Sequence, residues 1–207
     1  LPSLLDYKEA FGLFLIPTVA FVVIGSFLMN GVIQVRMNFL SLYMESVGYE
    51  GRIIGFVSGF AFFVAGVTAL QTEQAKRHLA PYWIVVFMVL LTAAANGIVP
   101  LFEAIPGLIL TTILFGIGVG LGMAFVLTLL SRSVPVSQFG LSVGLRTTGN
   151  RFGATILPPI AGFAIDFAGG NFGAGFTMTS IMFALGAVGI AILALRSKTI
   201  RDSFSKD

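Results

Sequence analysis

The sequence predicts an all-α, polytopic membrane protein with six transmembrane helices. Hydrophobic residues make up 57% of the 207 positions, charged residues only 10%, and the mean hydropathy is +0.98. A soluble domain exposes far more charge, and a helix that crosses a bilayer needs about 20 mostly apolar residues. The apolar residues fall into six stretches long enough for this, separated by short segments that hold most of the charges.

The six predicted spans differ in length. The first is longer than a bilayer requires, so we expect it to tilt or to protrude from the membrane. Pro81 and Trp83 stand at the start of the third, where an interfacial aromatic residue belongs. We interpret the chain as one six-helix bundle, with spans at about 11–44, 52–70, 82–101, 108–130, 140–167 and 176–195 and a cytoplasmic tail at 196–207.

Basic residues gather in alternate loops. Arg52 is the one basic residue in the other set of loops, which also hold Glu45, Glu50, Glu103 and Asp166. Cytoplasmic loops of membrane proteins carry an excess of Lys and Arg, so both termini are expected in the cytoplasm, in agreement with an even number of spans. The basic set comprises Lys8, Lys76, Arg77, Arg132, Arg196, Lys198, Arg201 and Lys206.

Side chains that carry enzymatic or metal chemistry are scarce. The chain has no cysteine, which excludes thiol nucleophiles and thiolate metal sites, and its single histidine, His78, excludes a multi-histidine metal site. No Asp or Glu lies in the middle of a predicted span. We therefore expect no enzymatic activity, no metal, no cofactor and no nucleic-acid partner.

The fifth span holds the chain's most unusual stretch, from Gly140 to Gly162. Arg146, Asn150 and Arg151 lie near the middle of this apolar segment. A charge at that depth costs roughly 2.5–3.5 kcal/mol on insertion scales, so both arginines must face protein, water or a ligand. A helical wheel separates one polar stripe (Ser142, Arg146, Asn150, Gly153) from a second (Thr147, Arg151, Thr155) and from an apolar stripe (Leu145, Phe152, Ile156, Phe163).

The polar residues of this stretch have two interpretations. Arg146 is a candidate ligand for an anionic or polar substrate, and its alternative role is an interhelical lock bonded to carbonyls of neighbouring helices. Arg151 is a further candidate for substrate binding, and it points about 140° away from Arg146, so the two are not expected to reach one ligand atom. Asn150 is equally consistent with substrate binding and with a hydrogen bond between helices.

Two adjacent prolines, Pro158 and Pro159, stand late in the same span. Each removes a backbone donor and clashes with the preceding turn, so a kink or local opening is predicted near residues 154–158. Thr155 is placed to satisfy a freed carbonyl. With Gly144 and Gly153, the prolines are candidate gating residues.

The first span carries a polar patch of its own. Asn30 and Gln34 share one face of a straight helix, whereas Arg36 lies roughly opposite. All three are candidates for substrate binding, although the two sets cannot both face one cavity. The alternative for Arg36 is an ion pair with Glu103 or Asp166 near the outer surface.

The fourth span contains glycines at every second position from Gly116 to Gly122. They form two overlapping pairs with four-residue spacing, and the two pairs lie on opposite faces. Other helices can therefore approach this span closely from both sides. Gly118 and Gly122 are the candidates for packing or gating here.

This organisation resembles one half of a major facilitator superfamily transporter. The fifth span reads Gly144, eight residues, Gly153, three residues, Leu157-Pro158, two residues, Ala161-Gly162, which is similar to the glycine–proline motif of antiporters in that family. Leu157 and Ala161 stand where the motif has glycine. The run GLRTTGNRFGATILPPIAGFAID also resembles the eleventh helix of bacterial members, so the likeness covers the chain as a C-terminal half.

The resemblance implies a secondary transporter in which two halves surround a central cavity and alternate its access. Arginines without intramembrane acids favour a small polar or anionic organic solute. The alternatives are a multidrug exporter of the same family and a non-transporting membrane module that binds partners or supports assembly. The expected surroundings are a bacterial cytoplasmic (inner) membrane and a second six-helix half, either the N-terminal half of the same protein or a second copy.

Overall fold

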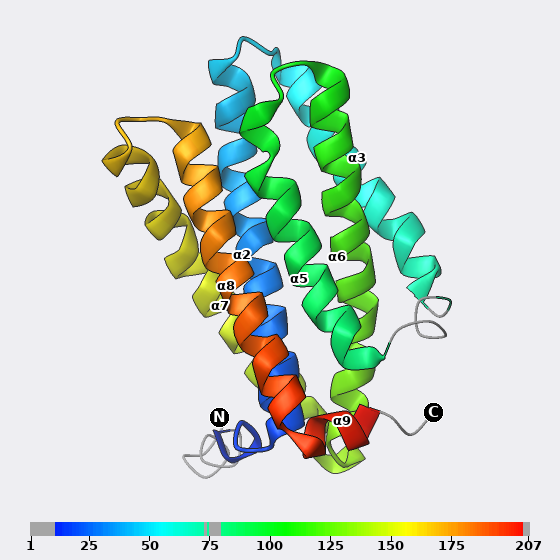
Figure 1. Cartoon of the computed structure of the whole chain (residues 1–207). Coiled ribbons are helices and arrows are strands. Elements are labelled where there is room, and N and C mark those ends of the chain that lie inside the picture. The colour runs from blue at the N-terminus through cyan, green and yellow to red at the C-terminus, as the bar shows by residue number, and fades with distance from the viewer. Residues whose placement is uncertain (1–10, 73, 75–79, 205–207) are drawn as a thin grey trace, which may run out of the picture.

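The computed structural model describes residues 11–72, 74 and 80–204 of the chain. Every regular element in this part of the chain is a helix (Figure 1). In chain order the elements are α2 (Pro17–Ser46), α3 (Gly51–Leu70), α5 (Pro81–Gly97), the 3-10 turn η1 (Val99–Leu101), α6 (Ile105–Ser133), α7 (Val136–Phe167), α8 (Phe172–Arg196) and the short α9 (Lys198–Phe204).

Among the described residues, five helices are long and apolar enough to cross a membrane, namely α2, α3, α5 continued by η1, α6 and α8. The sixth long helix, α7, has 32 residues, which exceeds the about 20 that a span requires. Arg146 and Arg151 make it less apolar than the others. The all-α, polytopic membrane fold predicted from composition is confirmed.

Proline and asparagine set several helix starts. Pro17 and Pro81 occupy the first positions of α2 and α5, where the missing N–H would have no partner within the helix. The first span therefore begins at Pro17, later than the predicted residue 11, and residues 11–13 form a separate helical turn. Asn171 caps α8, because its side-chain oxygen accepts a hydrogen bond from the backbone N–H of Ala174 at 3.2 Å.

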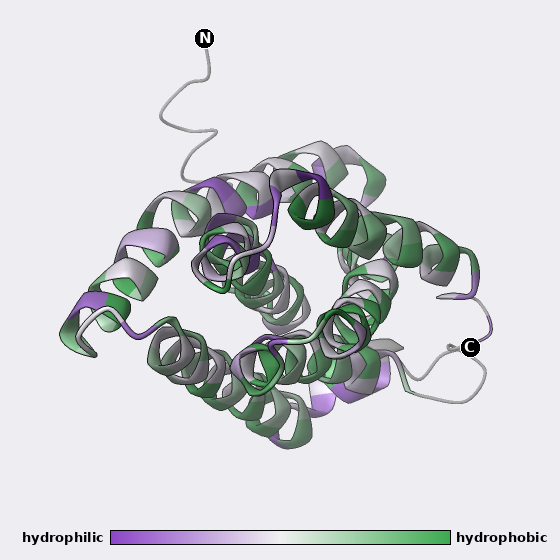
Figure 2. Cartoon of the chain, turned by 90° about the horizontal axis from the view of Figure 1, so that it is seen from above, coloured by the Kyte–Doolittle hydropathy of each residue, from purple (hydrophilic) through white to green (hydrophobic). Residues whose placement is uncertain are grey.

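Helix α2 lies in the middle of the bundle, as the view from above shows (Figure 2). Helices α8, α5 and α6 pack side by side on one flank of α2, and α7 and α3 lie on the other (Figures 1 and 2). Helix α3 packs chiefly on α6, so only 17% of its most apolar segment is buried, against 61% for α2. The α8–α5–α6 flank is thus closed, while the opposite flank leaves α2 partly uncovered between α7 and α3.

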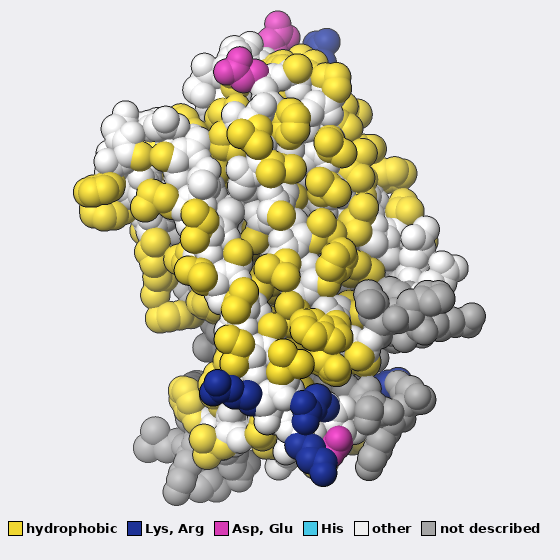
Figure 3. Space-filling model, in the orientation of Figure 1, with side chains coloured by type: hydrophobic (Ala, Val, Ile, Leu, Met, Phe, Trp, Pro, Cys, Tyr) yellow, Lys and Arg dark blue, Asp and Glu magenta, His cyan; other side chains and the backbone are white. Residues whose placement is uncertain are grey.

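Charged side chains occupy the two ends of the bundle, and the wall between them is apolar (Figure 3). Arg196, Lys198 and Arg201 lie at the end where α8 meets α9, and all three are exposed. Glu50 and Glu103 lie in the connections at the opposite end. On the face that Figure 3 shows, a band of apolar side chains lies between the two ends and suits the hydrocarbon core of a bilayer.

The glycines of α6 allow close packing on two faces. A Cβ added to Gly116 would lie 2.7 Å from the carbonyl oxygen of Ala61 in α3, and one added to Gly120 would collide with the backbone of Ala65. On the other face, a Cβ on Gly118 would lie 2.6 Å from the methyl of Thr92 in α5, and one on Gly122 would meet the Met29 and Met88 sulfurs. The two-sided approach that the spacing predicts is present, and α6 connects α3 to the rest of the bundle.

Replacing Gly120 by alanine should destabilise the protein by about 1–3 kcal/mol, because the new methyl must displace the α3 backbone. The matched control is Gly189→Ala on α8, where an added Cβ meets nothing within 4 Å. That control should be neutral or stabilising by up to about 1 kcal/mol, since alanine has a higher helix propensity than glycine. Thermal unfolding of the purified variants in detergent measures both, and equal effects would contradict the packing described for α6.

Candidate functional site

A polar patch crosses the contact between α2 and α7. The Ser26 side chain of α2 is fully buried, and its hydroxyl oxygen accepts a hydrogen bond from Nε of Arg146 at 2.8 Å. The same oxygen lies 3.2 Å from Nδ2 and 3.3 Å from Oδ1 of Asn150. One turn further along α2, Gln34 donates a hydrogen bond to Asn30 at 3.3 Å. We call these five residues the α2–α7 polar patch: Ser26, Asn30, Gln34, Arg146 and Asn150.

Small residues bring the two helices together beside the patch. A Cβ added to Gly153 of α7 would lie 2.8 Å from the ring of Phe27, so the ring lies directly on the glycine. A Cβ added to Gly31 of α2 would collide with Leu157. Leu157 therefore fills the space that Gly31 leaves open, although the glycine–proline motif that α7 resembles has glycine at this position. These contacts fix the separation at which Ser26 reaches Arg146.

The guanidinium group of Arg146 is bound through one of its three nitrogens in the described structure. Its Nε is bound to Ser26, whereas the two terminal nitrogens have no hydrogen-bond or ion-pair partner among the described residues. The side chain is neither fully buried nor fully exposed. A planar guanidinium with free terminal nitrogens presents a fork that matches a carboxylate or phosphate. The patch can thus bind an anion at Arg146 and hydrogen-bonding groups at Asn150, Gln34 and Asn30.

Arg151 lies outside this patch, as the helical wheel predicts. Its side chain is exposed, and so are its stripe neighbours Thr147 and Thr155. Both threonine hydroxyls donate to carbonyls of their own helix, at 2.8 and 3.0 Å. On the apolar stripe, Phe152 is 63% exposed and Phe163 is 72% exposed, so these two residues face outward, whereas Leu145 packs against the core of the bundle.

Arg36 lies in the interior of the bundle. It is 0% exposed, and its terminal nitrogens donate to Asn96 of α5 at 3.3 Å and to Thr111 and Thr112 of α6 at 3.2 and 3.0 Å. Its guanidinium carbon lies 4.7 Å from the ring centroid of Phe115, close enough for a cation–π interaction. These contacts tie α2 to α5 and α6.

This placement corrects two expectations for Arg36. The proposed ion pair with Glu103 or Asp166 is wrong, because the partners of Arg36 are the neutral side chains of Asn96, Thr111 and Thr112. Arg36 also faces away from the α2–α7 polar patch, and full burial within this bundle removes it as a substrate ligand here. Its Nε has no hydrogen-bond partner among the residues that the structure describes. Residue spacing separates Arg36 from Gln34 but does not reveal which helices surround it.

The adjacent prolines leave α7 unbroken. The helix runs without interruption from Val136 to Phe167, with Pro158 and Pro159 inside it. Of the two predicted outcomes near residues 154–158, the local opening is therefore wrong, and the kink stays a prediction. The Thr155 hydroxyl donates to the carbonyl of Arg151, not to the carbonyls that the prolines free. Of the two candidate gating glycines in this helix, Gly153 packs on Phe27, whereas a Cβ at Gly144 would meet nothing within 4 Å.

The described residues offer no metal site. They contain no group of three or more His, Asp or Glu side chains that could hold an ion. His78 and its neighbours Lys76 and Arg77 lie outside the described part of the chain. The polar chemistry of the bundle is therefore that of arginine, amide and hydroxyl groups.

The comparison with protein families decides what kind of molecule carries this patch. Residues 22–206 match the model of the Major Facilitator Superfamily. The chain belongs to this family. Neither the comparison with curated proteins nor that with solved structures gave a match.

Membership makes this an integral membrane protein and a transporter of the major facilitator type, and the size of the chain fits one half of such a transporter. Facilitators bind their solutes near the membrane midplane, between two halves. The α2–α7 polar patch lies on the flank of the bundle that α3 and α7 leave partly open, which is where a facilitator half can meet its cavity.

Ser26 is the member of the patch that the sequence did not single out. A lone serine in an apolar helix carries no signal of its own, since such serines commonly bond to their own helix. Its position four residues before Asn30 and eight before Gln34 was the available clue. That spacing continues the polar face of α2 towards α7.

A double-mutant cycle tests the role of Arg36. Asn96→Leu removes an acceptor from a buried charge, so it should cost about 1.5–3 kcal/mol of unfolding free energy in the otherwise unchanged protein. In the Arg36→Met background no charge needs that acceptor, and the same substitution should cost much less. Unfolding of the four proteins in detergent gives the coupling energy. An equal cost of Asn96→Leu in both backgrounds would show that Arg36 does not depend on this contact.

Proposed function

We propose that this facilitator moves a small polar or anionic organic solute by alternating access, with the α2–α7 polar patch as its contribution to the solute site. Arg146 contacts the anionic group of the solute through its two terminal nitrogens. Asn150, Gln34 and Asn30 accept or donate hydrogen bonds to the remaining polar groups. Arg151 and Arg36 take no direct part.

The observation that carries this proposal is the half-satisfied guanidinium of Arg146. A charge placed at membrane depth without a partner is costly, and intramembrane charges are kept where they pair, face a water-filled cavity or bind a ligand. No carboxylate pairs with Arg146 among the described residues, and Ser26 occupies only its Nε. An anionic solute would supply the missing partner.

A second six-helix half completes the cavity in this proposal. Asn38 of α2 and Arg151 of α7 are exposed, as are phenylalanines of α3, of which Phe56 is 61% and Phe63 65% exposed. In lipid, the exposed polar groups of α2 and α7 would cost several kcal/mol. The partner is the N-terminal half of a longer protein or a second copy of this chain, placed against α3, α2 and α7.

The proposed setting is a bacterial cytoplasmic membrane with the α9 end of the bundle in the cytoplasm. The basic residues Arg196, Lys198 and Arg201 gather at that end, and the acidic connections lie at the other. The positive-inside rule assigns the basic end to the cytoplasm.

Arg146→Lys tests the solute site. Lysine keeps the charge but cannot offer the planar fork, so the protein should fold while its affinity for a carboxylate or phosphate ester falls about tenfold or more. Uptake of radiolabelled monocarboxylates, dicarboxylates and phosphate esters into vesicles that contain the purified protein measures this. Arg151→Lys should have a smaller effect, and Arg52→Lys, at an exposed end of the bundle, should have none.

The thermal stability of the Arg146→Lys variant distinguishes a solute-binding role of Arg146 from a structural role. Thermal unfolding of Arg146→Lys should match that of the unchanged protein within about 1 kcal/mol, since Lys keeps its stem in place. A sharp loss of stability with unchanged solute affinity in the remaining folded protein would make Arg146 an interhelical lock. The anion proposal would then be abandoned.

Single cysteines test the orientation, because the chain has no cysteine of its own. Thr199→Cys on α9 should resist an impermeant thiol reagent that is added outside intact cells, whereas Ala104→Cys at the opposite end should react. Both positions are exposed, so both should react after the cells are opened. The reverse pattern in intact cells would contradict the proposed orientation.

A further inference from the structure

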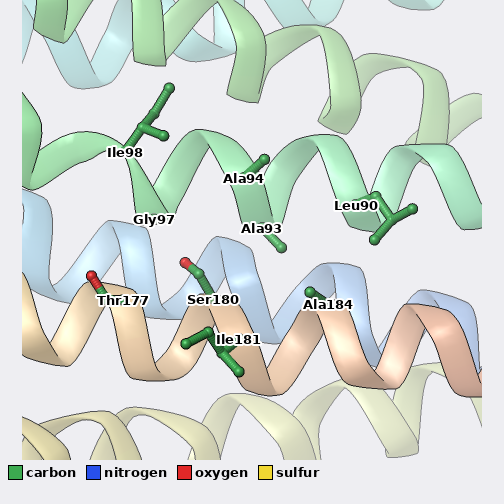
Figure 4. A pocket seen from close by; sticks show the side chains of 9 residues that line it. All are labelled: Leu90, Ala93, Ala94, Gly97, Ile98, Thr177, Ser180, Ile181 and Ala184. Carbon is green, nitrogen blue, oxygen red and sulfur yellow. The ribbon is translucent and has the colours of Figure 1, made fainter.

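An apolar groove runs along the contact between α5 and α8 (Figure 4). It has a volume of about 380 Å³ and an open outer side. The hydroxyl of Thr177 donates to the carbonyl of Gly173, and the hydroxyl oxygen of Ser180 is buried beneath the surface, so the wall presents hydrocarbon. The main lining residues are Leu90, Ala93, Ala94, Ile98, Ile181 and Ala184.

A second hollow continues the groove towards the start of α5. It has a volume of about 250 Å³ and is lined by Trp83, Val86, Phe87 and Leu90, of which Leu90 also lines the first groove. From Trp83 to Ala94 a helix rises about 16 Å at 1.5 Å per residue. That length is about half of the roughly 30 Å hydrocarbon core, which is the depth that one lipid acyl chain reaches.

Cations gather where this groove reaches the end of the bundle. Helix α9 packs against both α5 and α8 at that end. Tyr82, next to Trp83, packs against the core cluster that contains Ile200 of α9. Arg196 and Lys198 are exposed there and have no hydrogen-bond or ion-pair partner among the described residues. Figure 3 shows Lys and Arg side chains directly below the apolar wall.

We propose that the α5–α8 groove is a binding site for an anionic phospholipid of the surrounding bilayer. One acyl chain lies along Trp83, Phe87, Leu90 and Ala94, and the phosphate group contacts Arg196 and Lys198. Basic side chains beside a transmembrane helix attract anionic headgroups by about 1 kcal/mol each, and basic pockets between helices bind such headgroups specifically. An apolar groove that ends at paired cations matches both parts of the molecule.

The position of the groove favours a lipid over a protein partner. It lies on the closed α8–α5–α6 flank, opposite the open flank on which the polar groups of α2 and α7 require a second half (Figures 1 and 2). A half that covers α3 and α7 leaves α5 and α8 facing the bilayer. The lipid site is therefore independent of the proposed transport function.

The single tryptophan of the chain, Trp83, reports on this site directly. The protein is placed in vesicles of phosphatidylcholine and phosphatidylglycerol in which one of the two lipids carries brominated acyl chains, and the quenching of Trp83 fluorescence gives the relative affinity. Phosphatidylglycerol should be preferred at least fivefold, which is the effect of one cation. Arg196→Gln combined with Lys198→Gln should remove the preference.

Matched substitutions locate the acyl chain. Ala94→Phe fills the groove from α5 and should lower the preference for phosphatidylglycerol, and Ala184→Phe does the same from α8 should the first variant fail to fold. Leu185→Phe is the control, since Leu185 is 67% exposed on α8 and lies outside the groove. Arg52→Gln, at the opposite end of the bundle, should also leave the preference unchanged.

Three results would overturn the site. Equal quenching by the two brominated lipids would show that Trp83 contacts only bulk lipid. A full preference for phosphatidylglycerol in both groove-filling variants would place the lipid elsewhere. Quenching of Trp83 by neither lipid would show that protein covers the groove.

Discussion

The buried guanidinium group of Arg36 constrains the whole bundle. It carries a charge into an interior where its partners are the neutral side chains of Asn96, Thr111 and Thr112 and the face of Phe115. Burying a charge is tolerated only when hydrogen bonds replace the lost water, so α2, α5 and α6 must keep one mutual position and depth. The glycines of α6 allow α3 and α5 to reach that position, and the closed flank of the bundle follows from it.

A second intramembrane arginine, Arg146, lies at the contact between α7 and α2 and has fewer hydrogen-bond partners than Arg36. Its Nε is fixed by Ser26, which also contacts Asn150, while its terminal nitrogens have no partner in the described part of the chain. The two arginines therefore have different surroundings on the two flanks of α2. The closed flank holds a buried charge whose two terminal nitrogens are hydrogen-bonded, and the open flank holds a charge bound through Nε, which leaves its terminal nitrogens available to a solute. In alternating access, one half rocks as a rigid body against the other. The buried contacts of Arg36 support that rigidity, and the available nitrogens of Arg146 can contact a solute.

Sequence patterns predicted the class of fold and much of the geometry within single helices. Hydropathy defined the helices, and the helical wheel separated Arg146 from Arg151 and Arg36 from Gln34. Contacts between helices could not be predicted, because periodicity shows which residues share a face of a helix but not which other helix packs on that face. The neutral partners of Arg36 and the role of Ser26 depend on such relations. The local opening expected at Pro158 and Pro159 is absent for a local reason, because a long helix can lose the donors of two residues and remain helical when its other turns hold.

The most direct test of the central claim is whether a solute shields the α2–α7 polar patch. Asn30→Cys places a single thiol in the patch, and Ala104→Cys places one in the exposed connection before α6, at the end of the bundle. The rate of alkylation of each is measured with and without the carboxylates and phosphate esters that the vesicles take up. A solute that binds at the patch should slow alkylation at residue 30 and leave residue 104 unchanged. Equal slowing at both positions, or none at residue 30, would contradict the claim.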